Sequence, residues 1–413
     1  MTAPTTESDA AGLRAHLAQT LADDGLLDDA AWRRAVETVP RHRFVPGFYQ
    51  STETPSELGL TVWQPVTAAS DYGRWLATAY TDTTLITQFD GEEPDWDHAD
   101  RREGGAPTSS STLPSLVLQM WDDADIADGH NLLEIGTGTG YSTALACERL
   151  GSEAVTSIEV DPHRLQQAAS GLYSCDYTPD LAVADGRYGY WPSAPFDRIV
   201  AACSFRAVPG PWLAQTRPGG KILTTLGGWL YGYARVLLTV AADGTASGPL
   251  LPGTVSFMAA RAQEAPTFGN PAHWASLLIG DARLTRHPPE RIRAATPEAF
   301  FARFLAQCAI PNAQLTTTGE TVLLIDVVSG SVAALTPDEK DWNVRESGPL
   351  QLWTTVESLL DTYDEAGCPP PESFRLDVDP TGQHLRHPRM PEISIGTRSA
   401  AGGPAETLTP ETP

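Results

Sequence analysis

The chain has 413 residues, which is enough for two or three domains with at least one full hydrophobic core. Hydrophobic residues make up 41% and charged residues 19%, a composition typical of globular proteins and not of disordered ones. The 28 Lys and Arg residues against 52 Asp and Glu give a formal net charge of −24. This charge argues against a nucleic-acid partner, because phosphate binding needs clustered cations, and it favours a neutral or basic partner or serves solubility alone.

Membrane and export signals are missing from the sequence pattern. No apolar run approaches the roughly 20 residues that a membrane helix needs, and Met1–Ala10 has neither a basic start nor an apolar core. The five cysteines include no Cys-x-x-Cys pair, and His98 and His130 do not stand at metal-ligand spacing. We therefore expect a cytoplasmic protein with no membrane contact and no metal site, whose oligomeric state the sequence does not predict.

Residues 1–75 are expected to form an N-terminal helical segment. Apolar residues at helical spacing from Leu13 to Thr38 predict two short helices, the second of them capped by Asp. The prolines within Val39–Pro46 then predict a stiff, extended segment. Residues 82–107 are rich in Asp, Glu and Gly and predict a long acidic loop that is either a solvated insertion or a substrate contact.

The region 76–240 is expected to be the core, because strand and helix patterns alternate there as in a parallel, doubly wound α/β sheet. The helices are expected at 114–121, 143–149, 162–172 and 209–215, and the strands at 131–135, 154–160, 181–184, 196–201 and 221–226. Proline and glycine become frequent after residue 240, and strand-like stretches surround a helical pattern at Trp353–Tyr363. We expect an α+β extension at 241–392 and a disordered tail at 393–413.

The strongest chemical signal is the run Leu133–Tyr141, in which a buried strand enters a G-x-G-x-G turn ahead of a helix. Glycines allow the backbone to approach a ligand closely, and the spacing differs from the G-x-G-x-x-G of dinucleotide sites. With a carboxylate just before the turn, the pattern favours S-adenosylmethionine, whose methionyl end is cationic. The expected cofactor contacts from this run are Glu134, Gly136, Thr137, Gly138, Gly140 and Tyr141.

Two further acids follow at the ends of the next strands. Glu159 ends the second strand and is placed to accept hydrogen bonds from two ribose hydroxyls. Asp185 and Gly186 end the third strand, where an adenine amino group would lie. Glycine turns and exposed strand-end acids are common individually. Their occurrence in order on consecutive strands indicates a cofactor site at the switch point of the sheet.

From about residue 32 to about residue 228, the ordered motifs resemble the protein-L-isoaspartate O-methyltransferase family. The matching pieces are residues 39–46 (Val-Pro-Arg-His-Arg-Phe-Val-Pro), 79–82, 133–141, 184–186, 195–197 and 215–221. The resemblance implies a class I S-adenosylmethionine-dependent methyltransferase fold, with a Rossmann-like doubly wound sheet, N-terminal helices and the α+β extension. It also implies substrate contacts from Arg43, Tyr80 and His42, with a structural tie between the N-terminal helices and the sheet as the alternative.

The chain departs from that family at Pro107–Pro114, where the family has Gln-Thr-Ile-Ser-x-Pro. If the prolines align, Thr112 replaces the family's active-site Ser, with Ser111 and Ser110 as competitors and Ser109 as a substrate contact. The acidic loop and the C-terminal extension are further departures. These features resemble family members of actinobacterial graspetide and lanthipeptide pathways, which act on an ordinary L-Asp of a ribosomally made precursor peptide.

The reaction that this resemblance implies needs no general base, because an Asp side chain with a pKa of about 4 is already ionised. Orientation and desolvation are then the catalytic tasks. The resemblance predicts an O-methyltransferase that esterifies an L-Asp side chain of a ribosomally made precursor peptide, leading to aspartimide or isoaspartate or both. The acidic loop and the net charge of −24 predict that this peptide carries a basic patch. The alternatives are a general isoaspartate repair methyltransferase and a non-catalytic binding module.

Overall fold

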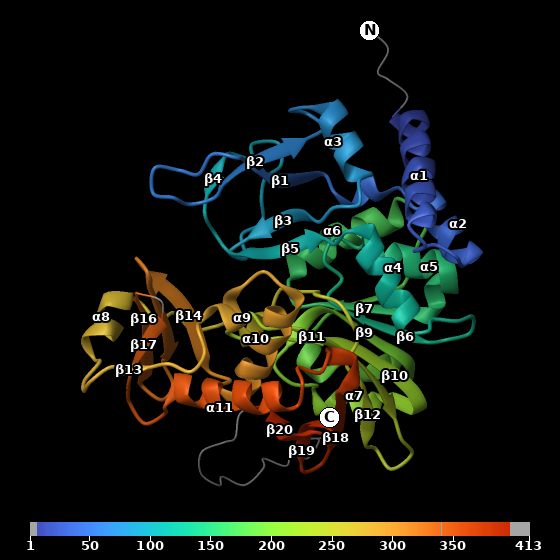
Figure 1. The fold of residues 1–413 in the computed structure, drawn as a ribbon. Coiled ribbons are helices and arrows are strands. Elements are labelled where there is room, and N and C mark those ends of the chain that lie inside the picture. The colour runs from blue at the N-terminus through green and yellow to red at the C-terminus, as the bar shows by residue number, and fades with distance from the viewer. Residues whose placement is uncertain (1–5, 340, 397–413) are drawn as a thin grey trace, which may run out of the picture.

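The computed structural model describes residues 6–339 and 341–396. Within these residues the strands form three sheets, of five, ten and five strands. Figure 1 shows the N-terminal sheet above the ten-stranded sheet and the C-terminal five-stranded sheet beside it. No helix in the described part is long and apolar enough to cross a membrane.

The chain begins with the two predicted helices, α1 (Thr6–Asp23) and α2 (Ala30–Thr38), and the Asp29 side chain caps α2 by accepting from the Ala31 amide. The segment expected to be extended is different, because Arg41–Phe44 forms a short 3-10 helix, η1. Pro40 directly precedes this turn, where its missing N–H has no helical partner to lose. Pro40 and Pro46 therefore exclude a long helix between them, but they leave room for a single turn of 3-10 helix.

The N-terminal sheet has the order β4-β2-β1-β3-β5. Its elements, together with helix α3, are β1 (Gly47–Ser51), β2 (Val62–Thr67), α3 (Tyr72–Ala79), β3 (Leu85–Phe89), β4 (Arg102–Glu103) and β5 (Pro107–Ser111). Residues 1–75 are thus not wholly helical, and residues 82–107 contain strand as well as loop. The acidic stretch is anchored by Trp96, whose ring lies so close to Gly47 that a Cβ there would be 2.3 Å from it.

The ten-stranded sheet has the order β20-β19-β18-β12-β11-β10-β9-β6-β7-β8. Its strands are β6 (Leu132–Ile135), β7 (Val155–Glu159), β8 (Asp180–Val183), β9 (Phe196–Phe205), β10 (Thr216–Leu226), β11 (Ala234–Val240), β12 (Ala246–Pro249), β18 (Arg375–Asp379), β19 (Gly382–His387) and β20 (Met390–Ile395). The neighbours among β6–β10 pair in parallel, which confirms the doubly wound core. The helices of this part are α4 (Pro114–Asp123), α5 (Tyr141–Leu150), α6 (Pro162–Tyr173) and α7 (Gly210–Gln215).

Most of the C-terminal region beyond residue 240 shares its core with the ten-stranded sheet, and only a small cluster around Leu323 and Ile325 is separate. Strand β18 pairs with β12, so β18–β20 extend the ten-stranded sheet, and one hydrophobic cluster runs from Leu133 to Ile395. Strand β20 also reaches into the expected tail at 393–413, of which residues 397–413 lie outside the described residues. The sequence pattern did not reveal this, because β12 and β18 are far apart along the chain.

The remaining elements form the third sheet, of order β13-β17-β16-β15-β14, and the helices around it. They are α8 (Pro271–Ser276), β13 (Arg283–Leu284), α9 (Glu290–Arg293), α10 (Pro297–Ala309), β14 (Ala313–Thr318), β15 (Thr321–Asp326), β16 (Ser331–Asp338), β17 (Asp341–Ser347) and α11 (Leu352–Glu365). Short 3-10 turns occur at Ser152–Ala154 (η2), Gly186–Tyr188 (η3), Trp191–Ser193 (η4), Arg261–Gln263 (η5) and Pro371–Ser373 (η6).

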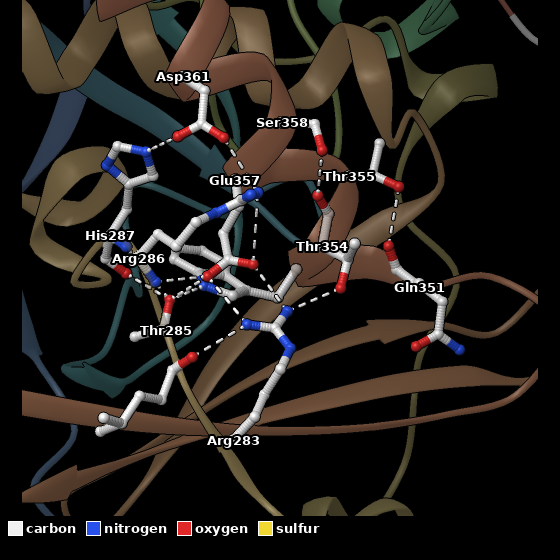
Figure 2. Close-up of polar contacts among 12 residues, drawn as sticks. Arg283, Thr285, Arg286, His287, Gln351, Thr354, Thr355, Glu357, Ser358 and Asp361 are labelled. Atoms are coloured by element: carbon white, nitrogen blue, oxygen red, sulfur yellow. Dashed lines mark hydrogen bonds and ion pairs between the residues drawn. The ribbon is translucent and has the colours of Figure 1, made fainter.

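A buried carboxylate on α11 fixes the chain that leads out of β13 (Figure 2). Glu357 is 1% exposed and accepts hydrogen bonds from Arg283 at 2.7 Å, from the Thr285 hydroxyl at 2.6 Å and from the Arg286 amide at 2.7 Å. Burial alone would raise the pKa of Glu357, but these hydrogen bonds outweigh it and lower the pKa. A carboxylate removed from water in this way is stable only while its donors remain.

Glu357→Gln is expected to lower the free energy of unfolding by about 2 kcal/mol near neutral pH, because charged hydrogen bonds are lost. The pKa of Glu357 is lower in the folded than in the unfolded chain, so its contribution is present above the unfolded pKa. That contribution disappears as the pH falls through the folded pKa, and the difference between variant and wild type should shrink. Denaturant unfolding at several pH values measures this.

The matched control is Glu365→Gln, an exposed glutamate at the end of the same helix, which should change little. An equal destabilisation by Glu357→Gln at neutral and at acidic pH would contradict the role given to the charge.

Candidate functional site

A cavity of about 1,200 Å³ lies at the carboxyl ends of the parallel strands. The strand order reverses between β6 and β9, and ligands of doubly wound sheets bind at such a switch point. Three parts of the chain line the cavity: β5 with the start of α4, the loops after β6–β9, and segments 228–233 and 254–265. Its volume exceeds the roughly 300–1,000 Å³ of a pocket for one small ligand, which leaves room for a second molecule.

The predicted glycine turn forms one wall of this cavity. Gly136, Gly138 and Gly140 have φ values of 97°, 54° and 87°, which L side chains rarely adopt. A Cβ on Gly140 would lie 3.0 Å from the Ala168 Cβ, so the turn also needs glycine for close packing against α6. The turn leads directly into α5, with Gly140 at its N-cap.

The two acids predicted on the following strands also line the cavity. Glu159 accepts from the Gly138 amide at 2.9 Å and from the Asp161 amide at 3.1 Å, and burial raises its pKa. Asp185 lies 2.7 Å from Arg187, whose hydrogen bond lowers the pKa of Asp185. The structure thus brings the glycine turn and both carboxylates together, while their contact with a cofactor stays a prediction.

Thr137, Tyr141 and Gly186 lie at this wall too. The Thr137 hydroxyl is 2.7 Å from that of Ser157, and the buried Tyr141 ring starts α5. Gly186 is required because a Cβ there would lie 2.4 Å from the Ile135 side chain. Thr137 and Gly186 are therefore held in place by the sheet itself.

Glu134 does not face the cavity, contrary to the expected cofactor contact. Its side chain is fully buried and accepts hydrogen bonds from Ser142 and Thr143 at 2.5 Å and from Ser157 at 2.8 Å. Burial raises the pKa of Glu134, and the three hydroxyl donors act against that rise. Glu134 therefore ties β6 to α5 and β7 beneath the turn. Ser142 and Thr143 at the start of α5 were the sequence signal that could have indicated this role.

Strand β5, whose residues carry the predicted catalytic hydroxyls, forms another wall of the cavity. Successive residues of the segment 109–112 differ in burial, because side chains along a strand point to alternate sides. Ser109 and Ser111 are buried; Ser109 accepts from Thr87 at 3.3 Å and Ser111 from Arg41 at 3.2 Å. Ser110 and Thr112 are half-buried, and within residues 6–339 and 341–396 their hydroxyls have no hydrogen-bond partner. Of the predicted catalytic hydroxyls, Ser110 and Thr112 are therefore the two available to a ligand.

Sequence reasoning missed Arg41, although it quoted the segment that contains it. The Arg41 guanidinium is fully buried and donates to the carbonyls of Thr83, Ser111 and Thr112 at 2.9–3.1 Å. Burial lowers its pKa to about 10, so it remains charged at neutral pH. Arg41 therefore fixes the position of β5 and of the hydroxyls that β5 carries.

The three predicted substrate residues of the N-terminal part do not line the cavity. His42 and Tyr80 are buried and bonded to each other at 2.6 Å, and burial lowers the pKa of His42 to about 4. Arg43 lies on the outside, where it donates to the Ser174 carbonyl at 2.8 Å and pairs with Glu7 at 3.3 Å. The structural alternative therefore fits, since these side chains tie α1 and α6 to η1.

The second missed feature is residues 254–265, here called the strap, which crosses the cavity from the C-terminal region. The Ser204 amide at the end of β9 donates to Met258 of the strap at 2.8 Å. Arg261 pairs with Asp161 at 3.1 Å and donates to Gln88 at 3.2 Å, so the strap joins α6 and the N-terminal sheet. Within the described ranges, no group of three or more His, Cys, Asp and Glu side chains is placed to hold a metal ion.

The donor set fits S-adenosylmethionine. The turn lacks Cβ atoms where a ligand approaches, carboxylates stand at the ends of β7 and β8, and the cavity exceeds the size of one small ligand. The backbone of Gly136–Gly140 would border the methionyl part, Glu159 the ribose hydroxyls and Asp185 the adenine.

Comparison with known proteins gives consistent matches. Residues 13–232 match the sequence profile of "Protein-L-isoaspartate(D-aspartate) O-methyltransferase (PCMT)". The chain is 30% identical over 213 residues to protein-L-isoaspartate O-methyltransferase 1 of Archaeoglobus fulgidus, covering 51% of this chain and 78% of the relative. It is 32% identical over 143 residues to the protein-L-isoaspartate O-methyltransferase of Thermococcus onnurineus, covering 33% of this chain and 63% of that relative, just under two thirds of its length.

A solved structure of a protein-L-isoaspartate O-methyltransferase has a TM-score of 0.50 at 19% identity. The superposition covers 91% of this chain and 99% of the other, so it extends beyond residues 13–232 into the C-terminal region. This confirms the class I S-adenosylmethionine-dependent methyltransferase fold with its additional C-terminal strands.

Gly138→Val is expected to weaken S-adenosylmethionine binding by at least about 100-fold, as judged by calorimetric titration. A β-branched residue is strained at a φ of 54°, and its Cβ would lie 3.5 Å from the Ser110 carbonyl across the cavity. The control is Gly129→Val, at a φ of 81° in open surroundings, which should strain the chain but leave cofactor affinity unchanged. Wild-type affinity in Gly138→Val would show that the turn does not hold the cofactor.

The profile match spans more than half of the 413 residues, and the A. fulgidus relative is covered over more than two thirds of its length. The glycine turn, the strand-end carboxylates and the fold agree with it. The chain therefore belongs to the protein-L-isoaspartate(D-aspartate) O-methyltransferase family, the S-adenosylmethionine-dependent protein carboxyl O-methyltransferases.

Proposed function

We propose that this chain methylates a carboxylate of an aspartyl-derived residue in a peptide or protein. The observation that carries the proposal is that β5 and the glycine turn lie close together at the same cavity. The Ser110 carbonyl lies 3.5 Å from where a Cβ on Gly138 would be. Ser110, in β5, and Thr112, directly after β5, both line the cavity, and their hydroxyls have no hydrogen-bond partner among the described residues. A carboxylate that accepts hydrogen bonds from these hydroxyls would lie beside the cofactor turn.

The residues of the cavity provide orientation and not proton transfer. S-adenosylmethionine supplies a methyl group on a positively charged sulfur. The acceptor carboxylate, with a pKa of about 4, is already ionised, so Ser110 and Thr112 need only hold and orient it. Cys203 also lines the cavity, but burial raises the pKa of its thiol, which keeps it protonated and unreactive.

The carboxylate of an L-isoaspartyl residue is the acceptor that the family match favours. The relatives from A. fulgidus and T. onnurineus are named for this substrate. The structure that superposes on 91% of this chain is also named a protein-L-isoaspartate O-methyltransferase, so a C-terminal region of this kind is compatible with that name. General isoaspartate repair is accordingly the first candidate.

The second candidate is the L-Asp side chain of a ribosomally made precursor peptide. It is favoured by the Ser-Ser-Ser-Thr run at 109–112 and by the acidic stretch 90–103 near the cavity, which would attract a basic peptide. Part of that charge is already neutralised, since Arg102 pairs with Asp90 and Arg164 with Glu93. The resulting ester would let the next backbone nitrogen close an aspartimide ring with loss of methanol.

Two isomeric peptides, one with L-Asp and one with isoaspartate at the same position, distinguish the candidates. We expect a methyl-ester mass gain on the isoaspartyl peptide if repair is the function. A methyl ester or a loss of water on the L-Asp peptide alone would establish the tailoring candidate. A KM for a basic L-Asp peptide that stays flat as salt rises would remove the electrostatic argument for it. Methylation of neither peptide would overturn the proposed function.

Thr112→Ala and Ser110→Ala are each expected to lower kcat by about 10- to 100-fold, the size of one lost hydrogen bond to a charged group. The affinity for S-adenosylmethionine should not change, because the glycine turn is intact. Thr112→Ser should restore most of the activity lost in Thr112→Ala. Steady-state kinetics with calorimetric cofactor binding measures the two effects separately. Full activity in both alanine variants would exclude these hydroxyls as the carboxylate contacts.

A further inference from the structure

Tyr231 stands at the cavity in a strained backbone conformation. Its φ is 56°, in the left-handed region that costs a bulky residue about 1–3 kcal/mol. The other described non-glycine residues with positive φ are Asp90, Asp125, Asp176, Glu339 and Cys368, so Tyr231 is the aromatic one among them. Its side chain is 62% exposed and lines the cavity, so the ring does not offset the strain by core packing.

Gly232 follows Tyr231 directly, but it cannot replace Tyr231 at the strained position, because close packing requires a glycine at 232 itself. A Cβ on Gly232 would lie 2.6 Å from the Phe304 backbone, so Gly232 permits the close approach of this loop to α10. Gln307 holds the loop by accepting from the Leu230 and Gly232 amides, each at 3.2 Å. The clamped backbone therefore fixes Tyr231 in its conformation and presents its ring at the cavity.

The position of Tyr231 in the sheet separates it from the cofactor residues. Asp185, Glu159 and the glycine turn follow β8, β7 and β6 in order, whereas Tyr231 follows β10, two strands beyond β6 on the other side. Two strand spacings correspond to about 10 Å. Tyr231 thus lies on the side of the glycine turn away from both carboxylates.

The strap adds the apolar side chain of Met258 to this side of the cavity. The Trp229 indole donates to the Gln263 carbonyl at 2.9 Å, which joins the Tyr231 loop to the strap. Met258 of the strap is half-buried and lines the same cavity, and its carbonyl accepts from the Ser204 amide at the end of β9, the strand next to β10. Aromatic and thioether side chains bind apolar groups of varied shape.

We propose that Tyr231 and Met258 form a subsite for an apolar side chain of the peptide, next to the residue that is methylated. The subsite rests on the proposed function, because it requires a peptide acceptor in the cavity. Strain retained at an exposed aromatic residue is characteristic of positions where a ligand is bound. The enzyme would therefore prefer acceptor residues with a large apolar neighbour.

The test uses the full chain and three peptides whose acceptor residue is flanked by Leu before it, by Leu after it, or by Gly on both sides. Wild type should show a KM about tenfold lower for one Leu peptide than for the Gly peptide, from burial of one apolar side chain. Tyr231→Gly and Tyr231→Asn should remove this preference, with kcat on the Gly peptide and cofactor affinity unchanged. Tyr231→Phe should retain it.

A stability measurement separates binding from folding. Glycine and asparagine tolerate a positive φ, so both variants should keep or raise the thermal midpoint. Asp176→Gly relieves a φ of 62° at an exposed site away from the cavity and should leave all kinetic constants unchanged. Equal KM values for the three peptides in wild type, or a preference that persists in Tyr231→Gly, would overturn the subsite alone. If no L-Asp or isoaspartyl peptide were methylated at all, the proposed function, on which the subsite rests, would be overturned.

Discussion

The buried guanidinium of Arg41 is the interaction on which the wall of the cavity that carries β5, the proposed acceptor side, depends. A cation without exposure to water is tolerated only when its donors are bonded, and Arg41 donates to carbonyls of the turn at 79–83 and of β5. These segments must therefore come together around one charge. The same guanidinium lies 5.5 Å from the Tyr141 ring centroid at the start of α5. Arg41 thus links β5 to the helix that begins at the glycine turn.

The cavity is completed by a region that the sequence pattern suggested was separate. Strands β18–β20 join the methyltransferase sheet through β12, and the strap reaches back over the end of β9. Arg261 fixes it to Asp161, which caps α6 two residues after Glu159. The C-terminal region therefore contributes walls to the site and does not merely enlarge the fold.

Sequence patterns predicted those features that arise from neighbouring residues. The glycine turn and the acids at 159 and 185 were found because strand, turn and helix follow one another locally. Glu134 was misplaced because adjacent strand residues face opposite sides, and its carboxylate is turned inward to the hydroxyls of α5 and β7. His42 and Arg43 were included as part of a family-like segment, whose motif does not show which side chain faces a cavity. The strap was not predictable, because its contacts join residues far apart in sequence.

The two sides of the cavity differ in hydrogen bonding of their polar groups and in backbone strain. On the cofactor side, the left-handed positions are occupied by glycine, and Glu134 and Glu159 accept hydrogen bonds with both oxygens. The acceptor side instead carries hydroxyls without partners in the described chain and a tyrosine in a strained conformation. Unsatisfied polar groups and local strain lower stability unless a ligand compensates for them. This difference argues that the side formed by the glycine turn is preorganised by the fold, and that, under the proposed function, the acceptor side is completed only when the peptide binds.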